Sequence, residues 1–158
     1  MLLNFFVSIA AGVVAAGFSV LYNAPSRTTF ASGLAGMAGW LVYASLPSDN
    51  GLDLFIAAGA ASFALSALSQ IFARRYKVPV IVFSIPALIP LVPGGTAYNT
   101  MRALMEENFD NTIRLGTETF FISGAIALGV SLSSAVCQVI HPRLSKKRLR
   151  PPMRGKKM

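Results

Sequence analysis

The sequence predicts an all-α integral membrane protein, a bundle of five transmembrane helices. Its 158 residues are 54% hydrophobic and 13% charged, with a mean hydropathy of +0.59, whereas a soluble domain usually carries about 25% charged residues. Five apolar segments reach or approach the roughly 20 residues that a helix needs to cross a bilayer core. They form one predicted transmembrane domain, 1–142, with spans at about 2–22, 30–46, 54–73, 78–93 and 119–140.

The first apolar segment is interpreted as a membrane span rather than as a cleaved secretory signal. No lysine or arginine precedes it, and it is longer than the roughly 7–15 apolar residues of a signal peptide. Asn23, Pro25 and Arg27 mark the break that follows. Arg27 has two possible roles: it fixes the end of this span, or it is only an anchor on the cytoplasmic side.

The charges in the breaks alternate in sign, and this pattern predicts an orientation. The first and third breaks hold only cations and the second only acids: Arg27, then Arg74, Arg75 and Lys77, against Asp49 and Asp53. The segment before the fifth span is net negative, with Arg102, Arg114, Glu106, Glu107, Asp110 and Glu118. Because cytoplasmic loops are enriched in lysine and arginine, we expect the N-terminus outside and the C-terminus in the cytoplasm of a bacterial inner membrane.

A basic cytoplasmic tail is predicted at 143–158. It holds eight of the fourteen lysines and arginines, so most of the net charge of +8 belongs to it. Each cation near an anionic lipid surface contributes ~1 kcal/mol. We therefore expect membrane lipids as its partner and no nucleic acid, with RNA binding as a remote alternative.

The sequence shows no catalytic constellation, so it predicts neither an enzyme nor a metal or cofactor site. His141 has no neighbours at metal-ligand spacing, and Cys137 lies in an apolar run as a small packing residue. The span interiors contain no Asp, Glu, Lys, Arg or His, although proton-coupled carriers usually place such groups inside the bundle. If the chain transports, its own contribution is backbone and hydroxyl groups, and any coupling residues belong to a partner.

The fourth span contains three prolines, Pro86, Pro90 and Pro93, and is followed at once by Gly94 and Gly95. An interior proline costs a helix ~3 kcal/mol, so we expect this helix to be broken. The carbonyls before Pro90 and Pro93 would lose helical partners, and a helix restarting near Thr96 would offer N–H groups to a carboxylate. The alternative is a kinked span that ends in a turn at the outer surface and binds nothing.

The segment after the break, 96–115, is predicted to be an amphipathic helix at the outer interface. Apolar residues recur there at helical spacing: Tyr98, Met101, Leu104 and Met105, with Phe109 and Ile113 continuing the same face. Thr96 is its predicted N-cap. The alternative is an ordinary solvated helix in a loop.

Small residues recur along three of the spans, which favours a compact bundle. The rows are Gly33, Gly36 and Gly39; Ala58, Ser62 and Ser66; and Ala125, Gly129 and Ser133. Small residues at such spacing let membrane helices approach closely.

Two elements of the chain resemble the threonine/serine exporter (ThrE) superfamily. The residues from Pro90 to Tyr98 resemble its P-x-x-P-G-x-x-x-Y signature, and those from Asn23 to Arg27 resemble its N-x-P-x-R element. The length, the five predicted spans and the basic end resemble most closely the small-subunit branch, the YjjB type. The long tail departs from the family pattern.

This resemblance implies an inner-membrane exporter subunit for small carboxylates, succinate-like in this branch, that works with a separate five-span partner of the YjjP type. The single-chain branch implies threonine and serine as the alternative substrates. The site residues it implies are Pro90, Pro93, Gly94, Gly95 and Tyr98, with Pro86 and Thr96 in support, and Thr96 and Tyr98 as hydrogen-bonding groups. Two inverted halves would form the complete exporter.

Two other functions remain open from the sequence. A membrane scaffold would use the small-residue faces to bind another complex, and its function would not depend on Pro90 or Gly94. A self-associating pore would pass solute without a partner subunit.

Overall fold

The computed structural model of the chain describes residues 2–46 and 51–140. All regular structure in these residues is helical, which confirms the predicted fold class. The elements are α1 (Leu2–Leu21), α2 (Ser26–Ser45), α3 (Gly51–Tyr76), α4 (Ile81–Leu88), the 3-10 helix η1 (Ile89–Leu91), α5 (Gly94–Met105) and α6 (Phe109–Ile140).

Three helices are long and apolar enough to cross a membrane, in the stretches 4–21, 53–76 and 109–140. The helical pair 81–91 and 94–105 also passes when taken together, but it is bent by 50° between its two parts. It is therefore either a broken span or a re-entrant loop. The described residues thus contain three or four candidate spans, and the five-span arrangement stays a prediction.

The predicted second span corresponds to α2, which is not one of the three helices that are long and apolar enough to cross a membrane. It packs against α1, α3 and α4, so much of its surface faces protein rather than lipid. Its buried residues are small or weakly polar: Thr28, Ala31, Ser32, Gly33, Ala35, Gly36 and Gly39. A helix in the centre of a membrane bundle can carry such residues because neighbouring helices cover them.

The glycines of α2 bring its neighbours into close contact. A Cβ added at Gly33 would lie 2.9 Å from the Gly12 carbonyl oxygen of α1, and one at Gly36 would lie 2.6 Å from the Ala15 Cβ. On the α3 side, a Cβ at Gly39 would lie 2.9 Å from a Leu65 methyl group. The predicted close approach along this row is confirmed.

The other two predicted rows meet each other, because α3 and α6 pack side by side. A Cβ at Gly129 would overlap both the Ser62 Oγ and the Gly59 carbonyl oxygen. Ser62, Ser66 and Ser133 are all buried. Close packing of small residues thus fixes α6 against α3, as expected for membrane helices.

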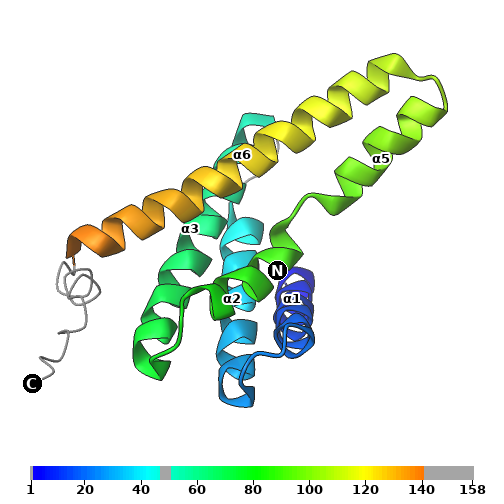
Figure 1. Cartoon of the computed structure of the whole chain (residues 1–158). Helices are drawn as coiled ribbons and strands as arrows, with labels where there is room; N and C mark the ends of the chain where they lie inside the picture. The colour runs from blue at the N-terminus through cyan, green and yellow to red at the C-terminus, as the bar shows by residue number, and fades with distance from the viewer. Residues whose placement is uncertain (1, 47–50, 141–158) are drawn as a thin grey trace, which may run out of the picture.

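The region after the Pro–Gly break differs from the predicted single amphipathic helix. Helix α5 ends at Met105, and Glu107 adopts a left-handed conformation with φ 56°. Phe109 and Ile113 belong to α6, which begins ten residues before the predicted fifth span. Figure 1 shows α5 and the first half of α6 as a hairpin that extends away from the bundle.

The extra length of α6 explains this hairpin. Its 32 residues span about 48 Å, which exceeds the roughly 30 Å of a bilayer core. Asp110, Arg114 and Glu118 all fall within its first ten residues. Residues 119–140, which match the length of a bilayer core, carry no charge.

The connections that carry cations lie at one end of the bundle. Helices α1 and α3 end at the side where α2 and α4 begin (Figure 1). Helix α6 also ends there, since Arg74 near the end of α3 contacts the Cys137 carbonyl. Asp49, His141 and the basic tail at 143–158 lie outside the described residues.

Candidate functional site

The Pro–Gly segment connects the bundle to the hairpin. Pro86 is buried within α4, Pro90 lies in η1, and the chain then becomes extended at Val92, with ψ 130°. Pro93 has ψ 56° and is the N-cap residue of α5, which begins at Gly94. Three prolines in eight residues thus end one helix and redirect the next, as their missing N–H groups and fixed φ require.

The carbonyls before Pro90 and Pro93 have donors within this segment. The N–H of Val92 donates to the Ile89 carbonyl at 3.3 Å, and the N–H of Gly94 donates to the Val92 carbonyl at 2.7 Å. Donors three and two residues further along thus take the place of the α-helical donor four residues on, so these carbonyls are not left without partners. Each carbonyl oxygen has a second lone pair, and that lone pair is what the segment can offer to a ligand.

The start of α5 retains donor capacity. The first N–H groups of a helix have no acceptor in a preceding turn. Here the N–H of Ala97 donates to the Pro93 carbonyl at 3.1 Å, whereas Gly95 and Thr96 fall among the first residues of α5, where a helix has no such acceptor.

Thr96 is not the N-cap of this helix, because the helix already begins at Gly94. Its hydroxyl instead donates to the Pro93 carbonyl at 2.9 Å. The predicted N-cap is therefore wrong by three residues, since Pro93 occupies that position. Tyr98, two residues further, is 69% exposed.

Neither the backbone conformation nor the packing of the described residues requires glycine at positions 94 and 95. Neither has a positive φ, and a Cβ added at either would meet nothing within 4 Å. Glycine at these positions keeps the start of α5 open to whatever approaches it.

The predicted site residues are therefore divided between two environments. Pro86 lies in the bundle, where the neighbouring Ala87 packs on α2 near Gly36. Gly94, Gly95 and Tyr98 are exposed on a helix that packs on α6. The structure brings the backbone of Pro93 and the hydroxyl of Thr96 together, but it does not gather all seven predicted residues around one cavity.

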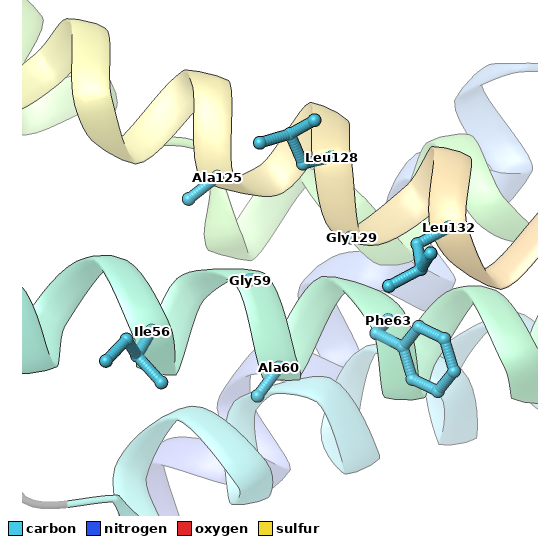
Figure 2. A pocket seen from close by; sticks show the side chains of 8 residues that line it. All are labelled: Ile56, Gly59, Ala60, Phe63, Ala125, Leu128, Gly129 and Leu132. Atoms are coloured by element: carbon cyan, nitrogen blue, oxygen red, sulfur yellow. The ribbon is translucent and has the colours of Figure 1, made fainter.

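A groove lies elsewhere, along the outer face of the α3–α6 pair. Its volume is about 540 Å³. Figure 2 shows its lining, which comes from both helices: Ile56, Gly59, Ala60, Phe63, Ala125, Leu128, Gly129 and Leu132. These side chains are all apolar, so the groove offers a carboxylate nothing to bind.

The residues predicted to set the topology have defined structural roles. Asn23 has φ 53° and Lys77 has φ 57°, the left-handed conformation that ends a helix. The matching hydrogen bonds run from the Ala24 N–H to the Ser19 carbonyl at 3.0 Å and from the Val78 N–H to the Ala73 carbonyl at 3.2 Å.

Pro25 is the N-cap residue of α2, in the position that Pro93 holds before α5. Its carbonyl accepts hydrogen bonds from both the N–H and the hydroxyl of Thr28. Arg27 and Arg75 are exposed at the cationic end of the bundle.

Sequence reasoning missed Gln70, a carboxamide inside the third apolar segment. It is 7% exposed, and its Nε2 donates to the Ser133 Oγ of α6 at 3.4 Å. The available signal was a carboxamide among alanine, serine and leucine residues. It was missed because the prediction of polar groups inside the spans considered only ionisable side chains. Arg74, one turn further, donates to the Cys137 carbonyl at 3.2 Å.

Comparison with known proteins identifies the family. Residues 7–136 match the family described as Threonine/Serine exporter, ThrE. This stretch is most of the chain, and it contains both the bundle and the Pro–Gly segment. The chain belongs to this family. The apolar helices of the chain fit a family of membrane exporters and a multi-pass membrane protein.

Two relatives of this exporter-family chain are longer than the chain itself. A threonine/serine exporter of Corynebacterium glutamicum is 28% identical over 144 residues, which cover 91% of this chain and 27% of the relative. An uncharacterised protein of Haemophilus influenzae is 25% identical over 130 residues, covering 77% of this chain and 43% of that protein. The chain thus spans less than half of either relative. No solved structure matches it.

Proposed function

We propose that this chain is one subunit of a two-component exporter of small carboxylates in a bacterial inner membrane. The observation that carries the proposal is the family match over residues 7–136. A transport role also agrees with the long apolar helices and with a chain that changes direction by 50° at the Pro–Gly segment. Broken helices are a common way for secondary carriers to build substrate sites.

The proposed substrate is a small carboxylate such as succinate, with threonine or serine as the alternative. Both classes carry a carboxylate, which the N–H groups and positive dipole end of a helix such as α5 stabilise. The exposed start of α5 at Gly94 and Gly95 supports this placement. Thr96 and Tyr98 would supply hydroxyl groups, and Pro86, Pro90 and Pro93 would fix the broken backbone.

The proposed partner is a second five-span subunit of the YjjP type. One observation supports a partner: α5 and much of α6 carry large apolar side chains that are exposed in the single chain. In this arrangement α4, η1 and α5 form a broken fourth span, the N-terminus lies outside and the C-terminus is cytoplasmic.

Efflux from intact cells tests this proposal. Cells that lack the gene are loaded with labelled succinate, threonine or serine and then supplied with this chain, the partner, or both. We expect export to return only when both are present. Efflux that is unaffected by deletion of this gene would reject the exporter role and favour a membrane scaffold.

A further inference from the structure

A polar seam runs between α3 and α6 toward the cationic end of the bundle. On α3 it consists of Ser62, Ser66, Gln70 and Arg74, spaced four residues apart, and on α6 of Gly129, Ser133 and Cys137, spaced likewise. The first three residues of α3 in the seam are buried. Arg74, at the cationic end of the seam, is exposed.

Gln70 is more polar than the packing of this seam requires. Alanine, glycine and serine are sufficient for close contact elsewhere along α3 and α6. A carboxamide has two N–H donors and an acceptor oxygen, whereas the hydrogen bond that Gln70 makes to Ser133 is long, at 3.4 Å. Typical bonds of this kind are about 2.9–3.0 Å. The amide is thus held near Ser133 with donor capacity to spare.

Arg74 adds a guanidinium one turn closer to the cationic end. One of its terminal nitrogens donates to the Cys137 carbonyl at 3.2 Å. The guanidinium has five N–H donors in a planar fork that matches a carboxylate. Its remaining donors are available to a ligand at this end.

The surrounding charge favours an anion. Arg27, Arg75 and Lys77 lie at the same end of the bundle, and the only carboxylate of α3, Asp53, is in its first turn at the opposite end. In α6 the described carboxylates, Asp110 and Glu118, are likewise confined to the far end. Clustered cations of this kind raise the local concentration of anionic substrates.

We infer that Arg74 and Gln70 form a carboxylate-binding site at the cationic end of the α3–α6 seam, separate from the Pro–Gly segment, with Ser133 holding the Gln70 amide in place. The inference rests on the proposed export function and deepens it, because it names where this chain first takes up its substrate. The guanidinium meets the carboxylate at the exposed end, and the amide of Gln70, one turn further along α3, donates to it there.

A purely structural role for Gln70 makes a different prediction. An interhelical hydrogen bond that only holds α6 on α3 would affect the amount of folded protein. It would leave the substrate dependence of the remaining protein unchanged. Half-saturating concentration, measured at matched abundance, therefore separates the two roles.

The test uses inside-out membrane vesicles from cells that express this chain together with its partner. Initial uptake of labelled succinate, and separately of labelled threonine, is measured over a range of concentrations. Hydrogen bonds to charged groups are strong enough that we expect Gln70→Ala and Arg74→Gln to raise the half-saturating concentration about tenfold or more. The substrate whose half-saturating concentration rises in these variants is the one that binds at Arg74 and Gln70.

Ser69→Ala is the matched control. Ser69 is buried next to Gln70, but its hydroxyl donates to the Leu65 carbonyl of its own helix at 2.8 Å. We expect this variant to retain the wild-type half-saturating concentration. Arg74→Gln keeps the test decisive if Gln70→Ala reduces abundance, because Arg74 is exposed.

The outcomes separate this inference from the proposed function. In one outcome, the wild type transports and both Arg74→Gln and Gln70→Ala have the wild-type half-saturating concentration. That result would overturn the proposed site but not the exporter function. An equal shift in Ser69→Ala would also overturn it, since the effect would then be one of general packing. Wild-type vesicles that transport neither substrate would overturn the proposed function and this inference with it.

Discussion

Gly129 determines how closely α6 approaches α3. Its Cα faces the Ser62 hydroxyl and the Gly59 carbonyl, with no room for a Cβ. The spacing of small residues predicted this contact, because Ala125, Gly129 and Ser133 fall on one helix face. The partner row could not be derived from sequence, since several faces of the other helices carry the same small residues.

Gly129→Ala should therefore destabilise the protein, although glycine to alanine usually favours a helix by about 0.5–1 kcal/mol. Overpacking at the Ser62 and Gly59 contacts should cost about 1–3 kcal/mol. Thermal unfolding in detergent measures the effect. Gly124→Ala is the control, since a Cβ there meets nothing within 4 Å. A Gly129→Ala midpoint equal to or above the wild type would contradict the close packing.

Gly94→Leu should abolish export while leaving membrane abundance intact. The side chain has open space in the chain itself, so the expected loss arises from blocking the start of α5 to substrate or partner. Gly17→Leu, another glycine with nothing within 4 Å, should export normally. Efflux and immunoblotting of the same cells check both variants. Retained export by Gly94→Leu would remove α5 from the site assignment.

At the scale of elements, helix ends were easier to predict than helix starts. Asn23 and Lys77 end α1 and α3 in breaks that charge and proline marked clearly. The start of α5 was misplaced because proline can serve as an N-cap residue without a side-chain hydrogen bond, and the serine and threonine preference favoured Thr96. The turn after Met105 was missed because Glu107 adopts its positive φ without a glycine.

The predicted orientation places the α1–α2 connection in the cytoplasm and the turn before α6 outside. Ser26→Cys and Asp110→Cys test it in a background where Cys137, the sole cysteine, is replaced by serine. A membrane-impermeant thiol reagent added to intact cells should label Asp110→Cys only. In inside-out vesicles it should label Ser26→Cys only. Labelling of both positions from one side would contradict the proposed topology.

At the scale of the whole molecule, composition was sufficient to predict an all-helical membrane protein, and the resemblance of the Pro90–Tyr98 and Asn23–Arg27 segments indicated the exporter family. It was not sufficient to predict which helices face lipid. Helix α2 contacts α1, α3 and α4, and which neighbours cover a helix is a property of the fold rather than of the segment. The hairpin of α5 and α6 also depends on packing that the single-segment pattern does not contain.

Transport by purified protein in lipid vesicles tests the central proposal, that this chain is one half of an exporter, most directly. Vesicles are prepared with this chain alone, the proposed partner alone, and both, and exchange of labelled succinate or threonine is measured. The account predicts exchange only when both proteins are present, and its loss with Gly94→Leu. Exchange by this chain alone would indicate a self-sufficient pore, and no exchange in any preparation would contradict the exporter role.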